Sequence, residues 1–209
     1  MFCTALLLVT VVNSNYENYN PIFRNKVKML AIPVKKSRGA SIKSIVVIHL
    51  KKTGDYSSAF DEVLVKYDAL RTQAIANDAT LAAVKSYLAQ LLYFEENFPV
   101  TGPDAAADLR LSYNWRSAFQ SSGQFSDGRF IVEKAATLFN LAARHTFEGQ
   151  KLDDPAAMKL CCEHWSNAAG IFKFIRTELG PTLGATGGSD LKPYVSHYMQ
   201  GVREVKAFV

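Results

Sequence analysis

The sequence lacks a long hydrophobic run and has few cysteines. Its 209 residues include three cysteines, and two of them, Cys161 and Cys162, are adjacent. Adjacent cysteines lack the spacing of a zinc-binding pair or a CxxC redox motif, and three cysteines cannot close a disulfide framework. The longest apolar run, residues 2–12, is shorter than the roughly 20 residues that span a bilayer. Because 48% of the residues are hydrophobic and 21% are charged, we expect one globular domain with reduced thiols.

The apolar run at residues 2–12 leaves two interpretations open. It has the length of a signal-peptide core, but it lacks a charged n-region and a clear cleavage site. The chain also has no Asn-x-Ser/Thr sequon, which disfavours a glycosylated, secreted protein. The other interpretation is that translation starts at Met29 and that residues 1–28 are an atypical extension.

Acidic residues are absent between Asn18 and Gly54. That segment contains nine of the 24 basic residues, which leaves 15 basic against 19 acidic residues elsewhere in the chain. The sequence pI of about 9.0 is therefore a property of the N-terminal segment. Such a segment is either a solvated flank or a weak contact for anionic lipid, and we expect no nucleic-acid partner.

Short β-branched stretches predict a small β element near the N-terminus. Residues 29–34 and 45–50 have this character, and Pro33 favours an edge position for the first. Residues 101–124 are less regular. Tyr113 and Trp115 alternate there like strand residues, so this stretch is either extended or a buried loop.

The remaining sequence repeats apolar residues with the period of amphipathic helices. Asp154-Pro155 is typical of a helix start, and Gly180-Pro181 of a helix end. We expect Leu160, His164 and Leu92 among the inward-facing residues. The expected helices cover about residues 56–76, 78–98, 127–146, 155–179 and 190–209.

The sequence meets no template for catalysis or metal binding. The GATGG segment at residues 184–188 has neither the GxGxxG spacing nor the Lys-Ser/Thr pair of a phosphate loop. Ser189 and Lys192 match SxxK, but a serine helix cap explains them equally well. Four histidines lie far apart without the spacing of metal ligands: His49, His145, His164 and His197.

Paired carboxylates are also poor candidates for acid–base catalysis. Neighbouring positions on a helix do not face each other. The pairs are Asp61-Glu62, Glu95-Glu96 and Asp153-Asp154. We therefore expect no enzyme, no cofactor, and no catalytic, cofactor-binding or metal-binding residue.

Several segments resemble the Bro domain of ALIX-type proteins, the adaptors of the endosomal sorting (ESCRT) machinery. VEKAATLFNLAA, residues 132–143, is similar to the family's EKaavLFNlaA helix, and we expect Glu133 and Lys134 to face outward. LRLSYNWRSAF, residues 109–119, is similar to a vtFtWyDAF segment. Three further matches are Phe98-Pro99, SNAAGIFKFIRTEL at residues 166–179, and MLAI with Lys35-Lys36 at residues 29–36.

This resemblance implies a mainly α fold: a TPR-like solenoid of helical hairpins with a small N-terminal β element. Residues 29–209 are expected to be the N-terminal portion of such a domain. The implied role is non-catalytic, namely docking the C-terminal amphipathic helix of an ESCRT-III subunit in multivesicular-body traffic. The expected location is the cytoplasm and endosome. The alternative is a secreted or membrane-associated helical protein led by its apolar N-terminus.

One departure from the family limits the assignment of a binding site. In the family, the ESCRT-III-binding patch is built on helices that begin around the end of this chain. The expected LAQAQE-aromatic helix is represented only by YMQGVREVKAF, residues 198–208. The partner-binding residues are therefore unknown at this stage.

Overall fold

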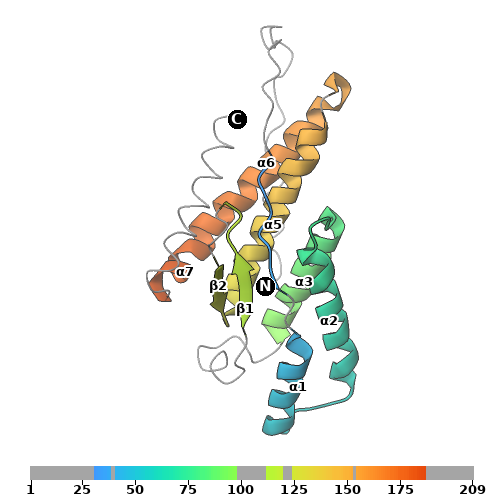
Figure 1. Cartoon of the computed structure of the whole chain (residues 1–209), viewed down its shortest axis with the longest axis vertical. Coiled ribbons are helices and arrows are strands. Elements are labelled where there is room, and N and C mark those ends of the chain that lie inside the picture. The colour runs from blue at the N-terminus through green and yellow to red at the C-terminus, as the bar shows by residue number, and fades with distance from the viewer. Residues whose placement is uncertain (1–30, 39–40, 98–111, 120–123, 153, 187–209) are drawn as a thin grey trace.

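Helices dominate the computed structural model, which describes residues 31–38, 41–97, 112–119, 124–152 and 154–186. Figure 1 shows long helical hairpins side by side, with shorter helices and a small sheet. The helices are α1 (Ile42–Thr53), α2 (Ala59–Ile75), α3 (Leu81–Asn97), α5 (Phe130–Lys151), α6 (Met158–Phe174) and α7 (Gly180–Thr186). The strands are β1 (Tyr113–Arg116) and β2 (Gln124–Asp127). The expected mainly α class with a small β element is confirmed.

The strand expected at residues 45–50 is wrong, because this segment belongs to helix α1. Ile42, Val46 and Leu50 are buried at every fourth position, so packing of one helical face overrides the β preference of the branched residues. Asp68 of α2 accepts the backbone N–H groups of Ile42 and Lys43. These donors have no partner within their own helix, so α2 supplies the N-terminal cap of α1.

The small sheet is formed by other segments than those expected. β1 and β2 pair antiparallel, with Trp115 opposite Phe125. Ser37 forms an antiparallel bridge with Trp115 on the other side of β1. The N-terminal segment, residues 31–38, therefore does contribute an extended edge, and its partner is β1. Of the two alternatives left open for residues 101–124, the extended one is confirmed at Tyr113–Arg116.

Helices α2 and α3 form an antiparallel hairpin. Tyr67 and Tyr87 meet between them with ring centroids 5.4 Å apart, and Phe94 packs against Tyr67. Leu92, expected on the buried stripe, is 40% exposed. The inward positions of α3 are Val84, Tyr87, Leu91 and Phe94, all buried.

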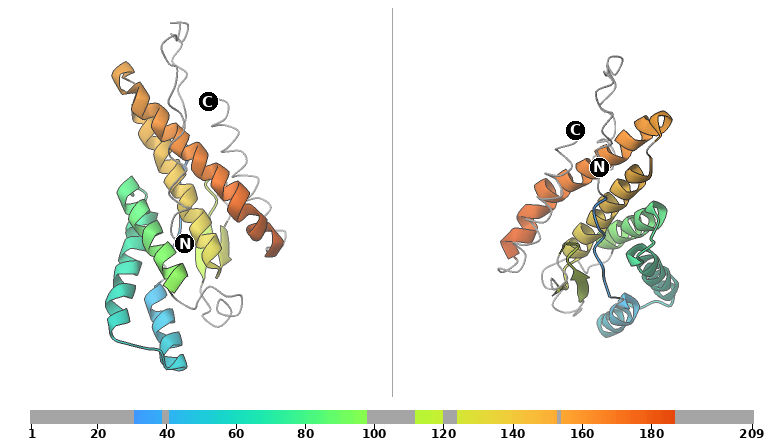
Figure 2. Two further views of the ribbon diagram at one scale, coloured as in Figure 1. Left: turned by 180° about the vertical axis from the view of Figure 1, so that it is seen from behind. Right: turned by 45° about the horizontal axis from the view of Figure 1, so that its top comes forward.

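Helix α5 is the centre of the fold. Figure 2 shows it between α3 and α6, and nearly every residue from Val132 to Thr146 is buried. Small side chains allow this close approach of neighbouring helices. The expected start of this helix at Ser126-Asp127 is wrong, because both residues belong to β2 and the helix begins at Phe130.

The helix expected to stop at Gly180-Pro181 continues to Thr186. A π-helical turn, Ile175–Leu179, joins α6 to α7, and the Gly180 N–H bonds the carbonyl of Ile175 five residues back. A proline normally clashes with the carbonyl four residues earlier, and the wider turn just before Pro181 provides room. Leu160, expected inward, is 47% exposed. The helix expected at residues 190–209 lies outside the described residues.

Replacing Gly54 or Gly170 by alanine tests two opposite requirements, one at the end of a helix and one inside a helix. Gly54 caps α1 at φ 85°, a conformation that costs other residues about 1 kcal/mol or more. Gly170 lies inside α6 with no atom within 4 Å of an added Cβ, where alanine is the better helix former by about 0.8 kcal/mol. We expect Gly54→Ala to lower, and Gly170→Ala to raise, the free energy of unfolding measured in urea. Equal signs for the two variants would contradict this account.

Candidate functional site

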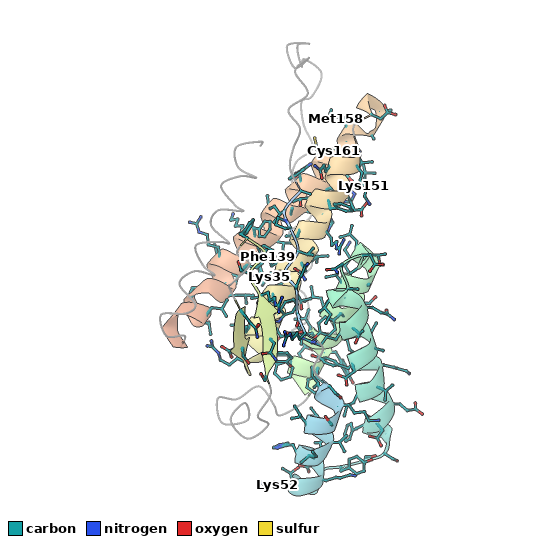
Figure 3. All side chains as sticks on the ribbon, in the orientation of Figure 1. Lys35, Lys52, Phe139, Lys151, Met158 and Cys161 are labelled. Atoms are coloured by element: carbon teal, nitrogen blue, oxygen red, sulfur yellow. The ribbon has the colours of Figure 1, made fainter. Side chains whose placement is uncertain are left out.

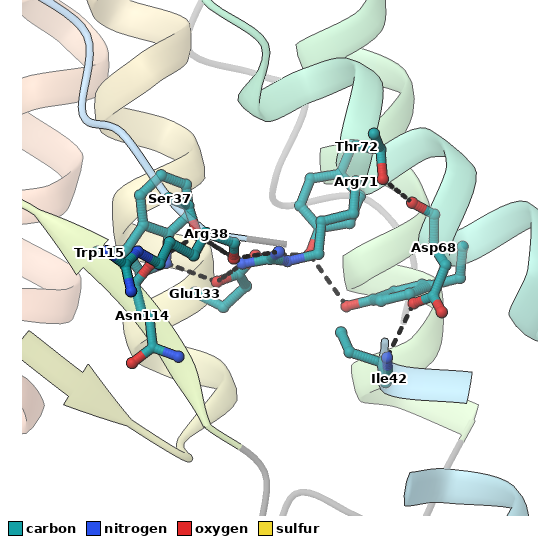
Figure 4. Close-up of polar contacts among 11 residues, drawn as sticks. Ser37, Arg38, Ile42, Asp68, Arg71, Thr72, Asn114, Trp115 and Glu133 are labelled. Carbon is teal, nitrogen blue, oxygen red and sulfur yellow. Dashed lines mark hydrogen bonds and ion pairs between the residues drawn. The ribbon is translucent and has the colours of Figure 1, made fainter. Parts of the chain in front are cut away.

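A buried carboxylate, Glu133 of α5, lies where α2, α3, α5 and β1 meet (Figure 4). Its Oε1 accepts hydrogen bonds from Arg71 Nε at 2.8 Å and Tyr87 Oη at 2.7 Å. Its Oε2 accepts one from Trp115 Nε1 at 2.7 Å. Glu133 is 0% exposed and Arg71 is 1% exposed. We call these four residues the Glu133 hub.

The Arg71 guanidinium extends the hub to the N-terminal segment. Its Nη2 donates to Ser37 Oγ at 2.9 Å, and Nη1 donates to the Arg38 carbonyl at 3.4 Å. The same group lies over the rings of Tyr113 and Trp115, 5.6 and 5.9 Å from their centroids. One ion pair therefore joins five segments that are distant in the sequence.

The hub is closed to any substrate. Burial, and next the charge of Glu133, raise the pKa of Tyr87 well above its usual value, so the phenol stays protonated and donates to the carboxylate. Burial lowers the pKa of Arg71, but the charge and hydrogen bond of Glu133 together with the neighbouring Tyr87 and Tyr113 outweigh burial, and the net shift of this pKa is upward. The fully buried Glu133 carboxylate accepts four hydrogen bonds, two of them from Arg71, and therefore holds the structure together. It does not offer an accessible acid or base.

A second polar contact clamps the N-terminal segment to α5. The Asn140 side chain accepts the Lys35 N–H at 2.7 Å and donates to the Lys35 carbonyl at 2.9 Å. Thr146 Oγ1 accepts the Ile32 N–H at 2.9 Å. The Lys35 ammonium lies over the Phe139 ring, and burial lowers the pKa of Lys35 to about 7. Figure 3 shows Lys35 and Phe139 beside each other at the middle of the molecule.

Comparison with protein families identifies the family to which this domain belongs. A family described as BRO1-like domain matches residues 29–202. The chain belongs to the BRO1-like domain family.

Known members with this domain are much longer than the chain. Mouse tyrosine-protein phosphatase non-receptor type 23 is 33% identical over 132 residues, which cover 61% of this chain and 8% of that protein. The pH-response regulator protein palA/RIM20 of Aspergillus oryzae is 26% identical over 172 residues, covering 78% of this chain and 20% of that protein. This chain therefore matches a fifth or less of the length of these relatives.

Solved structures share the fold of this BRO1-like domain. ALIX in complex with the SIVmac239 PYKEVTEDL late domain has a TM-score of 0.67 and 20% identity, covering 85% of this chain and 26% of that one. The ALIX BRO1 CHMP4C complex has a TM-score of 0.68 and 18% identity, covering 85% of this chain and 55% of that one. At these identities the likeness shows the fold alone.

The motifs that signal this BRO1-like domain have structural roles. Glu133 and Asn140 both come from the VEKAATLFNLAA segment, and Trp115 comes from the LRLSYNW segment. The outward orientation expected for Glu133 is wrong, because inside the core its Oε2 accepts from Trp115 and its Oε1 accepts from its two partners on other helices, Arg71 and Tyr87. Sequence reasoning missed both partners, since they lie on other helices, 62 and 46 residues away.

A histidine pair joins α5 to α6 at the far end of this hairpin from the sheet. His145 Nδ1 and His164 Nδ1 are 3.0 Å apart, so one ring donates to the other. Burial, and next the charges of Lys85 and His164, lower the pKa of His145 to about 4, while Glu148 opposes this shift. His164 was expected to face inward, but the sequence did not predict His145 as its partner. Within the described ranges no cluster of three or more metal-ligating side chains occurs.

The other residues that the sequence analysis considered for catalysis or binding lie on different elements. Asp61 and Glu62 lie in the first turn of α2, and Glu95 of α3 pairs with Lys134 at 2.6 Å. Gly184 belongs to α7. The SxxK pair, His197 and Asp153 lie outside the described residues. No helix in the described part of the chain is long and apolar enough to cross a bilayer.

The α5–α6 hairpin of this BRO1-like domain carries several exposed apolar side chains. Met158 and Leu160 at the start of α6 are 56% and 47% exposed, and Phe174 near its end is 41% exposed. Helix α6 packs on α5 through Cys161, Trp165, Ala168 and Phe172. The first turns of α6 therefore present apolar surface to solvent.

Neutralising Glu133 tests the hub. We expect Glu133→Gln to lower the free energy of unfolding by about 3–5 kcal/mol, because it leaves the buried Arg71 without a counter-charge. The control is Glu95→Gln, which breaks the partly exposed pair with Lys134 and should cost about 1 kcal/mol or less. Chemical denaturation of both variants measures the difference. Similar losses in the two variants would contradict a special role for Glu133.

Acid should weaken the α5–α6 hairpin through His145. In the unfolded chain this histidine binds a proton below about pH 6.5, but in the folded protein only near pH 4. Its stabilising effect is therefore full above pH 6.5 and is lost as the pH falls from 6.5 towards 4. We expect the free energy of unfolding to fall by about 2 kcal/mol between pH 7.5 and 5 because of this residue.

The pH dependence is measured by urea unfolding of His145→Asn against His49→Asn. His49 lies on α1, and the variant at this position should keep the full pH dependence. The free energy of unfolding of His145→Asn should change less between pH 7.5 and 5 than that of the parent chain. An unchanged slope in His145→Asn would exclude this histidine as the cause.

Proposed function

We propose that this chain is a non-catalytic protein-interaction module of an ALIX-like adaptor in endosomal sorting. It docks ESCRT-III subunits through their C-terminal amphipathic helix, in the cytoplasm and at endosomes. The observation that carries this proposal is the BRO1-like family match over residues 29–202 together with the fold shared with ALIX in its CHMP4C complex. In this proposal residues 1–28 are an atypical extension and residues 29–209 form the N-terminal portion of the domain.

A non-catalytic role is consistent with the chemistry of the described residues. One relative is called a phosphatase, but this chain matches only 8% of it, and the matching part is the BRO1-like domain. The Glu133 hub is buried and fully hydrogen-bonded. Its ion pair therefore supports the fold, and the exposed surface is left to bind partners.

Among the residues that the structure describes, we propose the apolar surface at the start of α6 as the contact for an amphipathic helix. Helix-in-groove recognition depends on apolar anchors that lose water on binding. Met158 and Leu160 supply such side chains, and the exposed Lys159 between them supplies a charge for the polar side of the partner helix. We assign the docking contact of this chain to these three residues.

We also propose a weak contact with anionic lipid through the basic N-terminal segment. Nine basic residues and no acidic residue occur between Asn18 and Gly54. A membrane contact of this kind would place the module beside the ESCRT-III subunits that assemble at endosomes.

A fluorescence anisotropy titration tests the docking proposal. The ligand is a labelled peptide of an ESCRT-III C-terminal helix, and a proline-interrupted version of the peptide is the control ligand. Met158→Asp and Leu160→Asp should each weaken binding about tenfold, because a buried charge replaces an apolar anchor. Leu92→Asp is the matched control on α3, where the side chain is also 40% exposed, and it should bind like the parent chain.

Two outcomes would overturn the docking proposal. One is binding of the native peptide no tighter than that of the proline-interrupted peptide. The other is an equal loss of peptide affinity in the α3 control and in the α6 variants, which would show that the contact does not lie at the start of α6. Circular dichroism melts of all variants confirm that each is folded at the assay temperature.

A further inference from the structure

On the outer face of the sheet, residues of the N-terminal segment and of β2 lie opposite residues of β1. The Arg116 N–H donates to the Lys36 carbonyl at 2.7 Å, and the Arg38 N–H donates to the Asn114 carbonyl at 3.3 Å. Lys36 is therefore opposite Arg116, and Arg38 is opposite Asn114. On the other side of β1, Gln124 is opposite Arg116 and Ser126 is opposite Asn114. We call these six residues the basic sheet face: Lys36, Arg38, Asn114, Arg116, Gln124 and Ser126.

Alternation along the strands directs these six side chains away from the core. Ser37 and Trp115 lie between them in sequence and point inward, where Trp115 is 1% exposed and bonds Glu133. Neighbouring residues of a strand point to opposite faces. Lys36, Arg38 and Arg116 are accordingly all exposed. Figure 4 shows Asn114 pointing away from the hub while Trp115 points into it.

The charges on the basic sheet face are of one sign. Its six residues include three cations, three neutral polar residues and no carboxylate. Lys36 and Arg116 are directly opposite each other, an arrangement that destabilises an antiparallel pair. Among the described residues, none of the three cations takes part in an ion pair. Asp127 of β2 points to the other face and pairs with Arg129 at 2.7 Å.

We propose that the basic sheet face binds the anionic headgroups of a lipid membrane. This inference rests on the lipid contact proposed above and assigns it to a surface. Two opposed cations without an acid between them lower the stability of the sheet, and an anion placed over them removes that repulsion. Strand geometry places such opposed Cβ atoms about 5 Å apart, so one phosphate group can contact both side chains. The basic segment of which Lys36 and Arg38 are part adds charge for a second headgroup.

The chemistry of this face favours lipid over a protein or a nucleic acid. Protein partners are held mainly by apolar and aromatic anchors, and the six residues include neither. Single-stranded nucleic acids bind through aromatic side chains on which bases stack, and the face has none. Exposed lysines and arginines bind an anionic membrane without such an anchor, because the negative surface potential of the bilayer attracts each positive charge.

Vesicle co-sedimentation of the 209-residue chain tests the proposal. Vesicles of phosphatidylcholine alone are compared with vesicles containing phosphatidylserine and a phosphoinositide. The test variant is Lys36→Gln/Arg116→Gln. The control is Lys66→Gln/Lys173→Gln, which removes the same charge from exposed positions on α2 and α6. We expect the test variant to bind anionic vesicles about 25-fold more weakly, at about fivefold for each cation. The control should change by less than about twofold.

A thermal melt of the same variants separates binding from folding. Because the test variant removes a like-charge pair, its Tm should be equal to or above that of the parent chain. A structural role for Lys36 and Arg116 would instead lower the Tm. Binding that is lost together with a lower Tm would overturn the proposal.

The remaining outcomes distinguish this inference from the broader lipid contact. If the parent chain does not bind anionic vesicles better than neutral ones, the proposed lipid contact itself fails. If the parent binds but the test and control variants bind equally, only the assignment to the basic sheet face fails. Three competitors are added to the vesicle-bound chain: an equimolar acidic peptide, single-stranded RNA, and millimolar inorganic phosphate. Release of the chain from anionic vesicles by any of them would show that a membrane is not the preferred ligand. This result would also overturn the assignment of lipid binding to the basic sheet face.

Discussion

The buried ion pair between Glu133 and Arg71 is the interaction on which the rest of this fold depends. Separated by 62 residues, the two side chains are both almost fully buried, and their remaining hydrogen-bonding groups contact Tyr87, Trp115 and the N-terminal segment. A charge pair of this kind is favourable only when every lone pair and N–H is engaged. Its geometry therefore fixes where both helical hairpins and the sheet can lie.

This constraint also determines which surface the sheet presents. The Trp115 indole must point inward to reach Glu133, so the strand alternation forces Asn114 and Arg116 outward. The bridge of Ser37 to Trp115 then places Lys36 and Arg38 on the same side as Arg116. A buried carboxylate thus sets the charge of an exposed surface.

Much of this architecture could be predicted from the sequence, because amphipathic periodicity reports helices α2, α3, α5 and α6 directly. The family resemblance was carried by short segments whose order was specific. Helix α1 was missed because its β-branched run favours a strand locally, and its cap is supplied by Asp68 from another helix. The hub was missed for a related reason: no local pattern shows that Glu133 faces the core or that Arg71 is its partner. The Leu160 and Leu92 positions followed the periodic stripes but lie at helix edges that no described element covers.

The clamp of the N-terminal segment has a consequence for how the chain folds during synthesis. Asn140 and Thr146 bind the backbone of Lys35 and Ile32 from 105 and 114 residues further along the chain. Contacts of such long sequence separation form late, because a large loop must close before they are made. As the ribosome extends the chain, residues 31–38 therefore have no partner on α5 until more than a hundred further residues have emerged. Throughout that interval the most basic part of the protein remains available to other molecules.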